Sequence, residues 1–357
     1  MRRWWEPRVG PREAQRLAEV IDSGYLNDGE LTAEFERRVA GLVGLPHAIA
    51  ATSGTAALFL ALAASGVGPG DEVLVPDLTF IATASAVKLA GATAVLVDVE
   101  ERSLGMCPRA AEAAITPRTR AMVPVHVSGR SAELPALLAL ARRFDLVVVE
   151  DACEALGSRN HGAALGAHGH LGCFSFSPNK TITCGQGGMV VTRDPRTATR
   201  IRELKDQGRP ARGTGGDDVY AALGFNFKLT NLQAAVGLAQ LEELDERLAH
   251  QRRLYQLYRE RLPVMPFAEG AGEVPQWVEG IFPQGAARDA AHDRLLAAGW
   301  ETRKFWHPLH TQKPYLADGG AFPVSNRLSP RLLWLPSSLG MTDDDVARVC
   351  DVLDEAA

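Results

Sequence analysis

The chain has 357 residues, a length that suits two domains, or one large domain with a smaller one attached. Its 46% hydrophobic and 23% charged residues are ordinary for a globular protein, and its net charge of −5 argues against nucleic acid or an anionic membrane as a partner. The longest apolar stretch, residues 56–64, is too short to span a bilayer. Five scattered cysteines favour a cytoplasmic location over a disulfide framework.

The first two-thirds of the chain alternates short apolar segments with amphipathic ones. Strands are predicted at residues 72–76, 94–99, 121–127 and 146–150, and helices at residues 79–90 and 133–143. Continuous apolar strands separated by helices indicate an α/β fold with a mostly parallel, mixed sheet flanked by helices. Ligands of such sheets bind beyond the carboxyl ends of the strands, so polar residues that follow strands are site candidates.

The last third predicts a different organisation. Residues 206–218, DQGRPARGTGGDD, are rich in glycine and predict a mobile loop. A long helix is predicted over residues 231–262 from apolar residues at helical spacing. We expect the domain boundary within this helix, which gives a large domain of residues 1–245 and a smaller C-terminal α/β domain of residues 246–357.

The first candidate motif is ATSGTAAL, residues 51–58, where small residues open a strongly helical run. Ser53, Gly54 and Thr55 can present backbone N–H groups and two hydroxyls at a helix N-terminus, which is a natural site for a phosphate. The alternative is a helix cap without a ligand, because serine and threonine are common caps.

The second candidate motif is VVVEDACEALG, residues 147–157, where an apolar strand ends in acidic residues. A carboxylate at this edge, Asp151, could keep the ring nitrogen of pyridoxal phosphate (PLP) protonated, so that the ring accepts electrons from a substrate. The alternative is a carboxylate favoured by the dipole at a helix N-terminus.

The third candidate motif is CFSFSPNKTITCGQGGMVV, residues 173–191, with Lys180 between two strands and beside a glycine run. A lysine that is desolvated in such a turn has a lowered pKa and becomes a nucleophile for an aldehyde. The alternative is a solvated loop lysine, the commoner environment of this residue type.

In order and spacing, these segments resemble the DegT/DnrJ/EryC1/StrS family of sugar aminotransferases, which belong to the aspartate-aminotransferase fold type of PLP enzymes. The resemblance covers nearly the whole chain and also includes EPRVG, GPGDEVLVP, LGFNFKLTNLQAAVGLAQLE, KFWHPLHTQKPY and LPSSLGMTDDDV. It is most specific in the lysine segment and in NLQAAVGLAQLE. It implies PLP as the cofactor and a fold with a large domain and a smaller C-terminal domain.

The resemblance also implies roles for individual residues. Lys180 matches the Schiff-base lysine that moves protons as general base and acid, and Asp151 matches the partner of the pyridinium nitrogen. The other residues that match cofactor contacts are Gly54, Thr55 and Ser175 for the phosphate, Phe80 for ring stacking, and Glu154 near the 3-oxygen. Asn226 matches an asparagine that reaches the phosphate of a neighbouring subunit, which implies a homodimer, and His310 lies in a segment that approaches the sugar.

Several positions near the expected site depart from the family pattern. Gln186 stands where the family usually has an acid, and Ser128 and Arg130 stand where many members have an aromatic residue and a glutamine or histidine. These departures leave the exact sugar open. No metal is expected, because the spacing of His161, His168 and His170 is not that of a metal site.

The predicted function is therefore transfer of an amino group, from glutamate by family analogy, to a nucleotide-linked keto sugar such as a 4-keto-6-deoxy sugar. A cyclitol ketone, another keto sugar, or a regulatory relative without turnover remain alternatives. Lysine rather than histidine at position 180 disfavours the sugar dehydratases of the family. A Rossmann dinucleotide enzyme is disfavoured because no GxGxxG follows the first strand.

Overall fold

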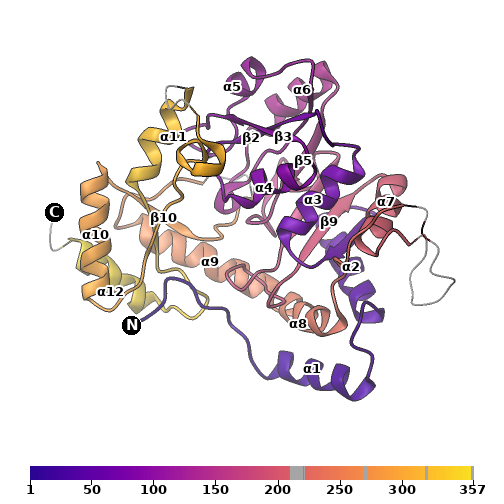
Figure 1. Ribbon diagram of the computed structural model, residues 1–357. Coiled ribbons are helices and arrows are strands. Elements are labelled where there is room, and N and C mark those ends of the chain that lie inside the picture. Colours follow the sequence, from indigo (N-terminus) through magenta and orange to yellow (C-terminus); the bar gives the residue numbers. More distant parts are fainter. Residues whose placement is uncertain (210–219, 221, 268–271, 318–320, 355–357) are drawn as a thin grey trace.

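The computed structural model describes residues 1–209, 220, 222–267, 272–317 and 321–354. A large sheet with helices on both faces forms one part of the molecule, and the C-terminal elements gather beside it (Figure 1). None of the helices in these ranges is both long and apolar enough to cross a membrane. The predicted α/β fold, with a large mixed sheet and a smaller C-terminal unit, is confirmed.

The large sheet has seven strands in the order β1-β9-β8-β5-β4-β2-β3. The strands are β1 (His47–Ala51), β2 (Glu72–Pro76), β3 (Thr93–Val97), β4 (Thr119–Met122), β5 (Val147–Asp151), β8 (Leu171–Ser175) and β9 (Gly188–Thr192). Six of these strands run in the same direction, and β9, between β1 and β8, runs in the opposite direction. The carboxyl ends of β5 and β8, which pair in parallel, therefore meet at one edge of the sheet.

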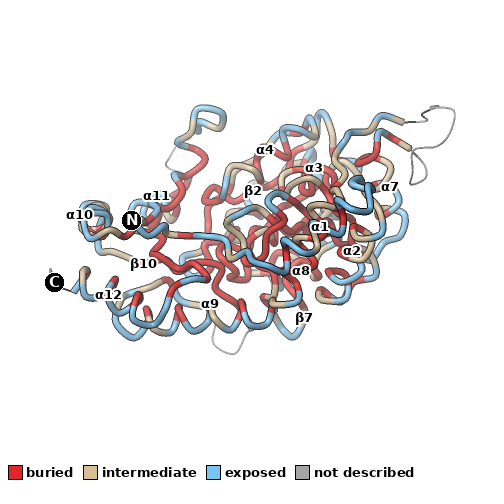
Figure 2. Tube along the Cα trace, turned by 90° about the horizontal axis from the view of Figure 1, so that it is seen from below, coloured by how far each residue is buried: buried red, intermediate tan, exposed pale blue. Residues whose placement is uncertain are grey.

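Both faces of this sheet are buried, because successive side chains of each strand enter different cores. On β1, Ala48 and Ala50 pack into a core with α2 (Glu30–Val43) and α8 (Asn231–Glu242). Ile49 on the same strand packs into the opposite core. Helices α3 (Gly54–Ala64), α4 (Ala82–Leu89) and α7 (Pro195–Lys205) cover that second face. Figure 2 shows the buried strands between helices whose outer surfaces are exposed.

The large part also contains the helices α1 (Pro11–Ser23), α5 (Pro108–Ala113) and α6 (Leu134–Phe144) and a small sheet of the two strands β6 (Arg159–Asn160) and β7 (Ala163–Ala164). Helix α1 packs on α8, and α5 packs on α6. The segment before α1 runs along the C-terminal part, where the Trp4 carbonyl accepts a hydrogen bond from the backbone N–H of Ser337.

The C-terminal part is built on an antiparallel sheet in the order β10-β12-β11. Its elements are β10 (Val278–Ile281), β11 (Arg303–Lys304), β12 (Leu332–Leu335), α9 (Leu244–Arg259), α10 (Gly285–Ala297), α11 (Pro323–Leu328) and α12 (Asp343–Asp354). On β12, Leu333 and Leu335 pack into a core with α9, α10 and α12, whereas Trp334 between them packs into an aromatic cluster on the other face. This aromatic face contributes to the pocket described below.

The element bounds agree with the sequence predictions in part. Strand β2 matches the predicted residues 72–76, but the helix predicted at residues 79–90 begins only at Ala82. The helix predicted over residues 231–262 is two helices, α8 and α9, because Glu243 leaves the helical region with φ −104° and ψ 8°. The domain boundary at residues 245–246 stays a prediction. Most of the loop predicted at residues 206–218 lies outside the described residues.

Candidate active site

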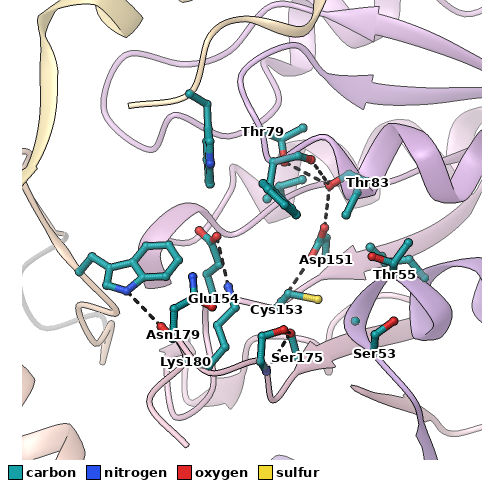
Figure 3. A pocket seen from close by; sticks show the side chains of 18 of the residues that line it. Ser53, Thr55, Thr79, Thr83, Asp151, Cys153, Glu154, Ser175, Asn179 and Lys180 are labelled. Carbon is teal, nitrogen blue, oxygen red and sulfur yellow. Dashed lines mark hydrogen bonds and ion pairs between the residues drawn. The ribbon is translucent and has the colours of Figure 1, made fainter. Parts of the chain in front are cut away.

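A pocket of about 350 Å³ lies where the carboxyl ends of β5 and β8 meet the N-terminus of α3, and aromatic residues of the C-terminal part close its other side (Figure 3). Most residues predicted for the site line this pocket: Ser53, Gly54, Thr55, Phe80, Asp151, Glu154, Ser175 and Lys180. They come from segments that are far apart in the sequence. The sheet brings them together, as its topology predicts.

The N-terminus of α3 forms the floor of the pocket near β8. Ser53 caps the helix, and its Oγ accepts a hydrogen bond from the Ala56 N–H at 3.1 Å. A Cβ at Gly54 would lie 2.9 Å from Ser175 Cβ and from Cys153 Sγ, so only glycine fits there. The remaining N–H groups of the first turn and the neighbouring hydroxyls suit a phosphate.

Asp151 ends β5 and is 5% exposed. Its Oδ2 accepts a hydrogen bond from Thr83 Oγ1 at 2.8 Å, and its Oδ1 accepts one from the Cys153 N–H at 3.1 Å. Thr79 Oγ1 lies 3.1 Å from Thr83 Oγ1 and extends this network (Figure 3). The carboxylate therefore has one donor on each oxygen and a fixed orientation. The sequence analysis did not identify Thr83 as a site residue, because its position within a predicted helix gives no sign of a contact with Asp151.

Lys180 projects into the pocket opposite Asp151 (Figure 3). Its Nζ lies 3.4 Å from Glu154 Oε1 and 4.7 Å from the ring centroid of Trp277. Burial raises the pKa of the Glu154 carboxyl, although Lys180 and a 3.0 Å hydrogen bond from the Ser128 N–H favour its charged form. The lysine thus lies between a carboxylate of the large part and an indole of the C-terminal part.

The C-terminal part contributes a wall that the sequence motifs did not indicate. Trp277, Trp306 and Trp334 line the pocket together with Arg303. The Trp277 and Trp334 ring centroids are 5.4 Å apart, and Trp277 Nε1 donates to the Asn179 carbonyl beside Lys180 at 3.2 Å. The abundance of tryptophan, six residues in the chain, was the available signal, but nothing in it distinguishes a pocket wall from a core.

Two of the positions that depart from the family pattern lie behind the pocket. Arg130 and Ser128 are buried and do not line it. Arg130 Nη2 donates to Glu279 Oε2 at 2.7 Å, and Trp334 Nε1 donates to Glu279 Oε1 at 3.1 Å. Ser128 Oγ also donates to Glu279. These residues thus connect the large part to β10, whereas Gln186 does line the pocket.

Asn226 and His310 lie outside the pocket of the single chain. Asn226 is exposed and bridges to Asp206 in an antiparallel pair. His310 is buried, with its Nδ1 2.8 Å from Asp77 Oδ2 and its ring stacked on Phe322 at 4.5 Å. Their predicted contacts, with a neighbouring subunit and with the sugar, stay predictions. No group of three potential metal ligands occurs among the described residues.

Comparison with known proteins agrees with this geometry. The profile of the DegT/DnrJ/EryC1/StrS aminotransferase family matches residues 7–354. The chain belongs to this family. It is 39% identical over 365 residues to GDP-perosamine synthase of Caulobacter vibrioides, with 98% of this chain and 96% of that protein covered.

Two more relatives illustrate the range of the family. The chain is 38% identical over 344 residues to UDP-N-acetyl-3-dehydro-α-D-glucosamine 3-aminotransferase of Acidithiobacillus ferrooxidans, covering 94% of this chain and 91% of that protein. The crystal structure of DesI with its TDP-sugar product superposes with a TM-score of 0.90 at 34% identity, covering 99% of this chain and 92% of that one.

As a member of this family, the chain is a PLP-dependent aminotransferase. The residues of the pocket fit this cofactor. The first turn of α3 offers N–H donors to its phosphate, the anchored carboxylate of Asp151 suits its ring nitrogen, and Lys180 lies within the same cavity.

Proposed function

We propose that this aminotransferase transfers the amino group of glutamate to a nucleotide-linked keto sugar, and that the acceptor is a 4-keto-6-deoxy sugar. Two relatives above 35% identity are named for GDP- and UDP-linked sugars, and DesI was crystallised with a TDP-sugar, which supports a nucleotide-linked acceptor. In the overall reaction the C–NH₂ group of glutamate becomes C=O, and the C=O group of the sugar becomes C–NH₂. The second product is 2-oxoglutarate.

The observation that carries this proposal is the meeting of Lys180 and Asp151 in one cavity with the N-terminus of α3. When bound, PLP supplies an electron sink for the carbon that bears the amino group. Asp151, held by Thr83 and the Cys153 N–H, would keep the ring nitrogen protonated. The α3 N–H groups would hold the phosphate and so fix the ring against this carboxylate.

Lys180 would hold the cofactor covalently and then move protons at the reacting carbon. A general acid–base group needs a position close to the proton that it moves, and such groups contribute about 100- to 10,000-fold to rates. Glu154 at 3.4 Å and the Trp277 ring at 4.7 Å define where the Lys180 ammonium rests.

Borohydride labelling tests the role of Lys180. Reduction of the holoenzyme fixes the cofactor to the lysine that holds it, and we expect the peptide with Lys180 to carry the label. Lys180→Ala should carry none, whereas Lys88→Ala, which removes an exposed lysine 4.9 Å from the Tyr315 ring, should label like the wild type. A label on another lysine would overturn the assignment.

Amination assays test the acceptor. The enzyme is incubated with glutamate and, in separate reactions, with GDP-, UDP- and dTDP-linked 4-keto-6-deoxy sugars and with a cyclitol ketone. We expect 2-oxoglutarate to form with one of the nucleotide-linked sugars. Its formation with the cyclitol ketone alone would replace the proposed acceptor.

We also propose that two copies of the chain share their active sites. The exposed apolar residues Tyr25, Leu26, Leu223 and Phe225 support this, as does the exposed Asn226 next to Phe225 in the sequence. The Thr52 N–H donates to the Phe227 carbonyl at 3.0 Å, so this segment lies next to the N-terminus of α3. A second copy on this surface would bring its own Asn226 close to the phosphate region.

Hybrid dimers test the shared site. Asn226→Ala and Lys180→Ala are each expected to be weakly active or inactive, but mixing them should restore activity, because one site of each hybrid then has both residues intact. Mixtures that stay inactive, or a monomer in sedimentation, would contradict the proposal.

We also propose a cytoplasmic location, which the five unpaired cysteines support.

A further inference from the structure

Arg303, on β11, has an unusual environment for a cation at the edge of a pocket. Its guanidinium lies over two indole rings, 5.3 Å from the Trp334 centroid and 5.6 Å from the Trp4 centroid. It forms no ion pair with any residue that the structure describes. The two rings therefore orient a charge that is left available to an anion.

The neighbouring Lys304 differs in orientation. Side chains on a strand alternate between its faces, and Lys304 Nζ lies 2.7 Å from Asp289 Oδ1 on α10. Arg303 instead pairs across the strands with Trp334, on the face that lines the pocket. Of these two adjacent cations, Lys304 pairs with a carboxylate, whereas Arg303 lines the active-site pocket.

Arg303 also marks the junction between the pocket and an outer groove. The groove has a volume of about 540 Å³ and shares with the pocket the residues Thr79, Phe80, Arg303 and Trp306. The other residues that line the groove are Ile81, Lys304, Phe305, His307, Thr311 and Gln312. The pocket itself, at about 350 Å³, is near the lower limit for small-molecule sites, so a bound cofactor leaves little room and a large substrate must extend into the groove.

We propose that Arg303 binds the diphosphate of the nucleotide-linked acceptor and that the outer groove holds its nucleoside. This inference rests on the proposed function, because it concerns the acceptor of the same reaction. A planar guanidinium forms paired hydrogen bonds to phosphate oxygens, and the contacts of Arg303 with two indole rings limit where those bonds can form.

The contacts of Arg303 and Lys180 with different indole rings favour a diphosphate over the carboxylate of the amino donor as the ligand of Arg303. Lys180 lies over the Trp277 ring and Arg303 over the Trp334 ring, two different indoles of one cluster. The α-carboxylate of an amino acid is attached to the carbon that bears the amine, and it must stay close to Lys180. In a sugar nucleotide, the sugar ring separates the reacting carbon from the diphosphate.

Binding of nucleoside diphosphates to the holoenzyme tests this assignment. GDP, UDP and dTDP, and the corresponding nucleosides without phosphate, are titrated by calorimetry into the wild type, Arg303→Gln and Lys88→Gln. We expect at least one diphosphate to bind the wild type and to bind Arg303→Gln about 10- to 100-fold more weakly, as expected for loss of a charged hydrogen-bond donor. Lys88→Gln removes an exposed cation that lines neither the pocket nor the groove, and its affinity should stay within about twofold.

The reaction with glutamate, followed by the absorbance of the cofactor, separates the outcomes. The cofactor absorbance of Arg303→Gln before glutamate is added should match that of the wild type, which verifies that the variant is folded, and its glutamate reaction should slow less than its diphosphate affinity falls. If Arg303→Gln binds the diphosphates as tightly as the wild type, the assignment of Arg303 to the diphosphate is wrong, whereas the proposed acceptor class still stands. A slowed glutamate reaction with unchanged diphosphate binding assigns Arg303 to the amino donor instead. If the wild type reacts with glutamate but binds no diphosphate and aminates no nucleotide-linked sugar, the proposed acceptor class fails as well.

Discussion

The two walls of the pocket are built in different ways. On the large-part wall, Asp151 and Ser175 end neighbouring parallel strands, and hydrogen bonds hold the carboxylate of Asp151 on both oxygens. On the C-terminal wall, Arg303 lies over the Trp334 ring, and Trp334 donates a hydrogen bond to Glu279 of the same part of the molecule. The hydrogen bonds of the first wall hold a group that suits the cofactor, whereas in the second wall Trp277 contacts Lys180 and Arg303 contacts other indole rings. We expect changes in the first wall to affect the reactions of both substrates.

The largest effect should follow from Asp151→Asn. The amide cannot stabilise a protonated ring nitrogen as the anion does, and loss of such an electrostatic partner costs about 100- to 1,000-fold in rate. Because the ring serves both substrates, single-turnover rates with glutamate and with the acceptor should fall together. A variant that loses only one of the two reactions would contradict the assignment of Asp151 to the cofactor.

A smaller loss is expected from Thr83→Val, which keeps the shape of the side chain and removes the 2.8 Å hydrogen bond to Asp151 Oδ2. A hydrogen bond to a charged group contributes about 1.5 kcal/mol or more, which corresponds to about tenfold in rate or in cofactor affinity. Cofactor binding to the apoenzyme, measured by fluorescence, should weaken by this factor. Thr83→Ser keeps the hydroxyl and should restore it, and equal defects in both variants would indicate a packing effect.

The sequence predicted residues of the large-part wall but not those of the C-terminal wall. Lys180 and Asp151 follow apolar strands, and the topology of a parallel sheet brings such strand ends together. Trp277 and Arg303 lie on a separate small sheet, whose docking depends on packing between distant segments, so no local pattern indicates their position. Glu243 shows a related limit, since the helical periodicity continues across the residue where α8 ends. Ser128 and Arg130 were expected near the substrate, but their buried partner Glu279 lies about 150 residues away in the sequence, as the separations of 151 and 149 residues show.

A third, smaller loss of turnover is expected when the contact between Lys180 of the large part and Trp277 of the C-terminal part is removed. Trp277→Leu removes the ring that lies 4.7 Å from Lys180 Nζ, and cation–π contacts at partly exposed sites contribute about 0.5–1 kcal/mol. We expect turnover to fall about two- to fivefold with both substrates, because Lys180 serves both. Trp277→Phe keeps a ring face and loses only the hydrogen bond to the Asn179 carbonyl, so its turnover should lie between the two. A loss confined to the acceptor would place Trp277 among the acceptor contacts.

The smallest effect concerns Glu154 and appears as a pH dependence of stability. Burial raises the pKa of this carboxyl above its ordinary 4.5, so the folded chain holds the proton more tightly than the unfolded chain. The stability that Glu154 contributes is therefore complete below about pH 4.5 and is lost as the pH rises through the folded pKa. Glutamine has no proton to lose, so the thermal midpoint of the Glu154→Gln apoenzyme should rise relative to that of the wild type as the pH increases from about 4 to about 8.

Glu243→Gln is the matched control, because hydrogen bonds from Arg8 and Arg247 lower the pKa of the Glu243 carboxyl and the trend should have the opposite sign. A difference between Glu154→Gln and the wild type that stays constant with pH would show that the carboxylate is as well stabilised in the pocket as in water.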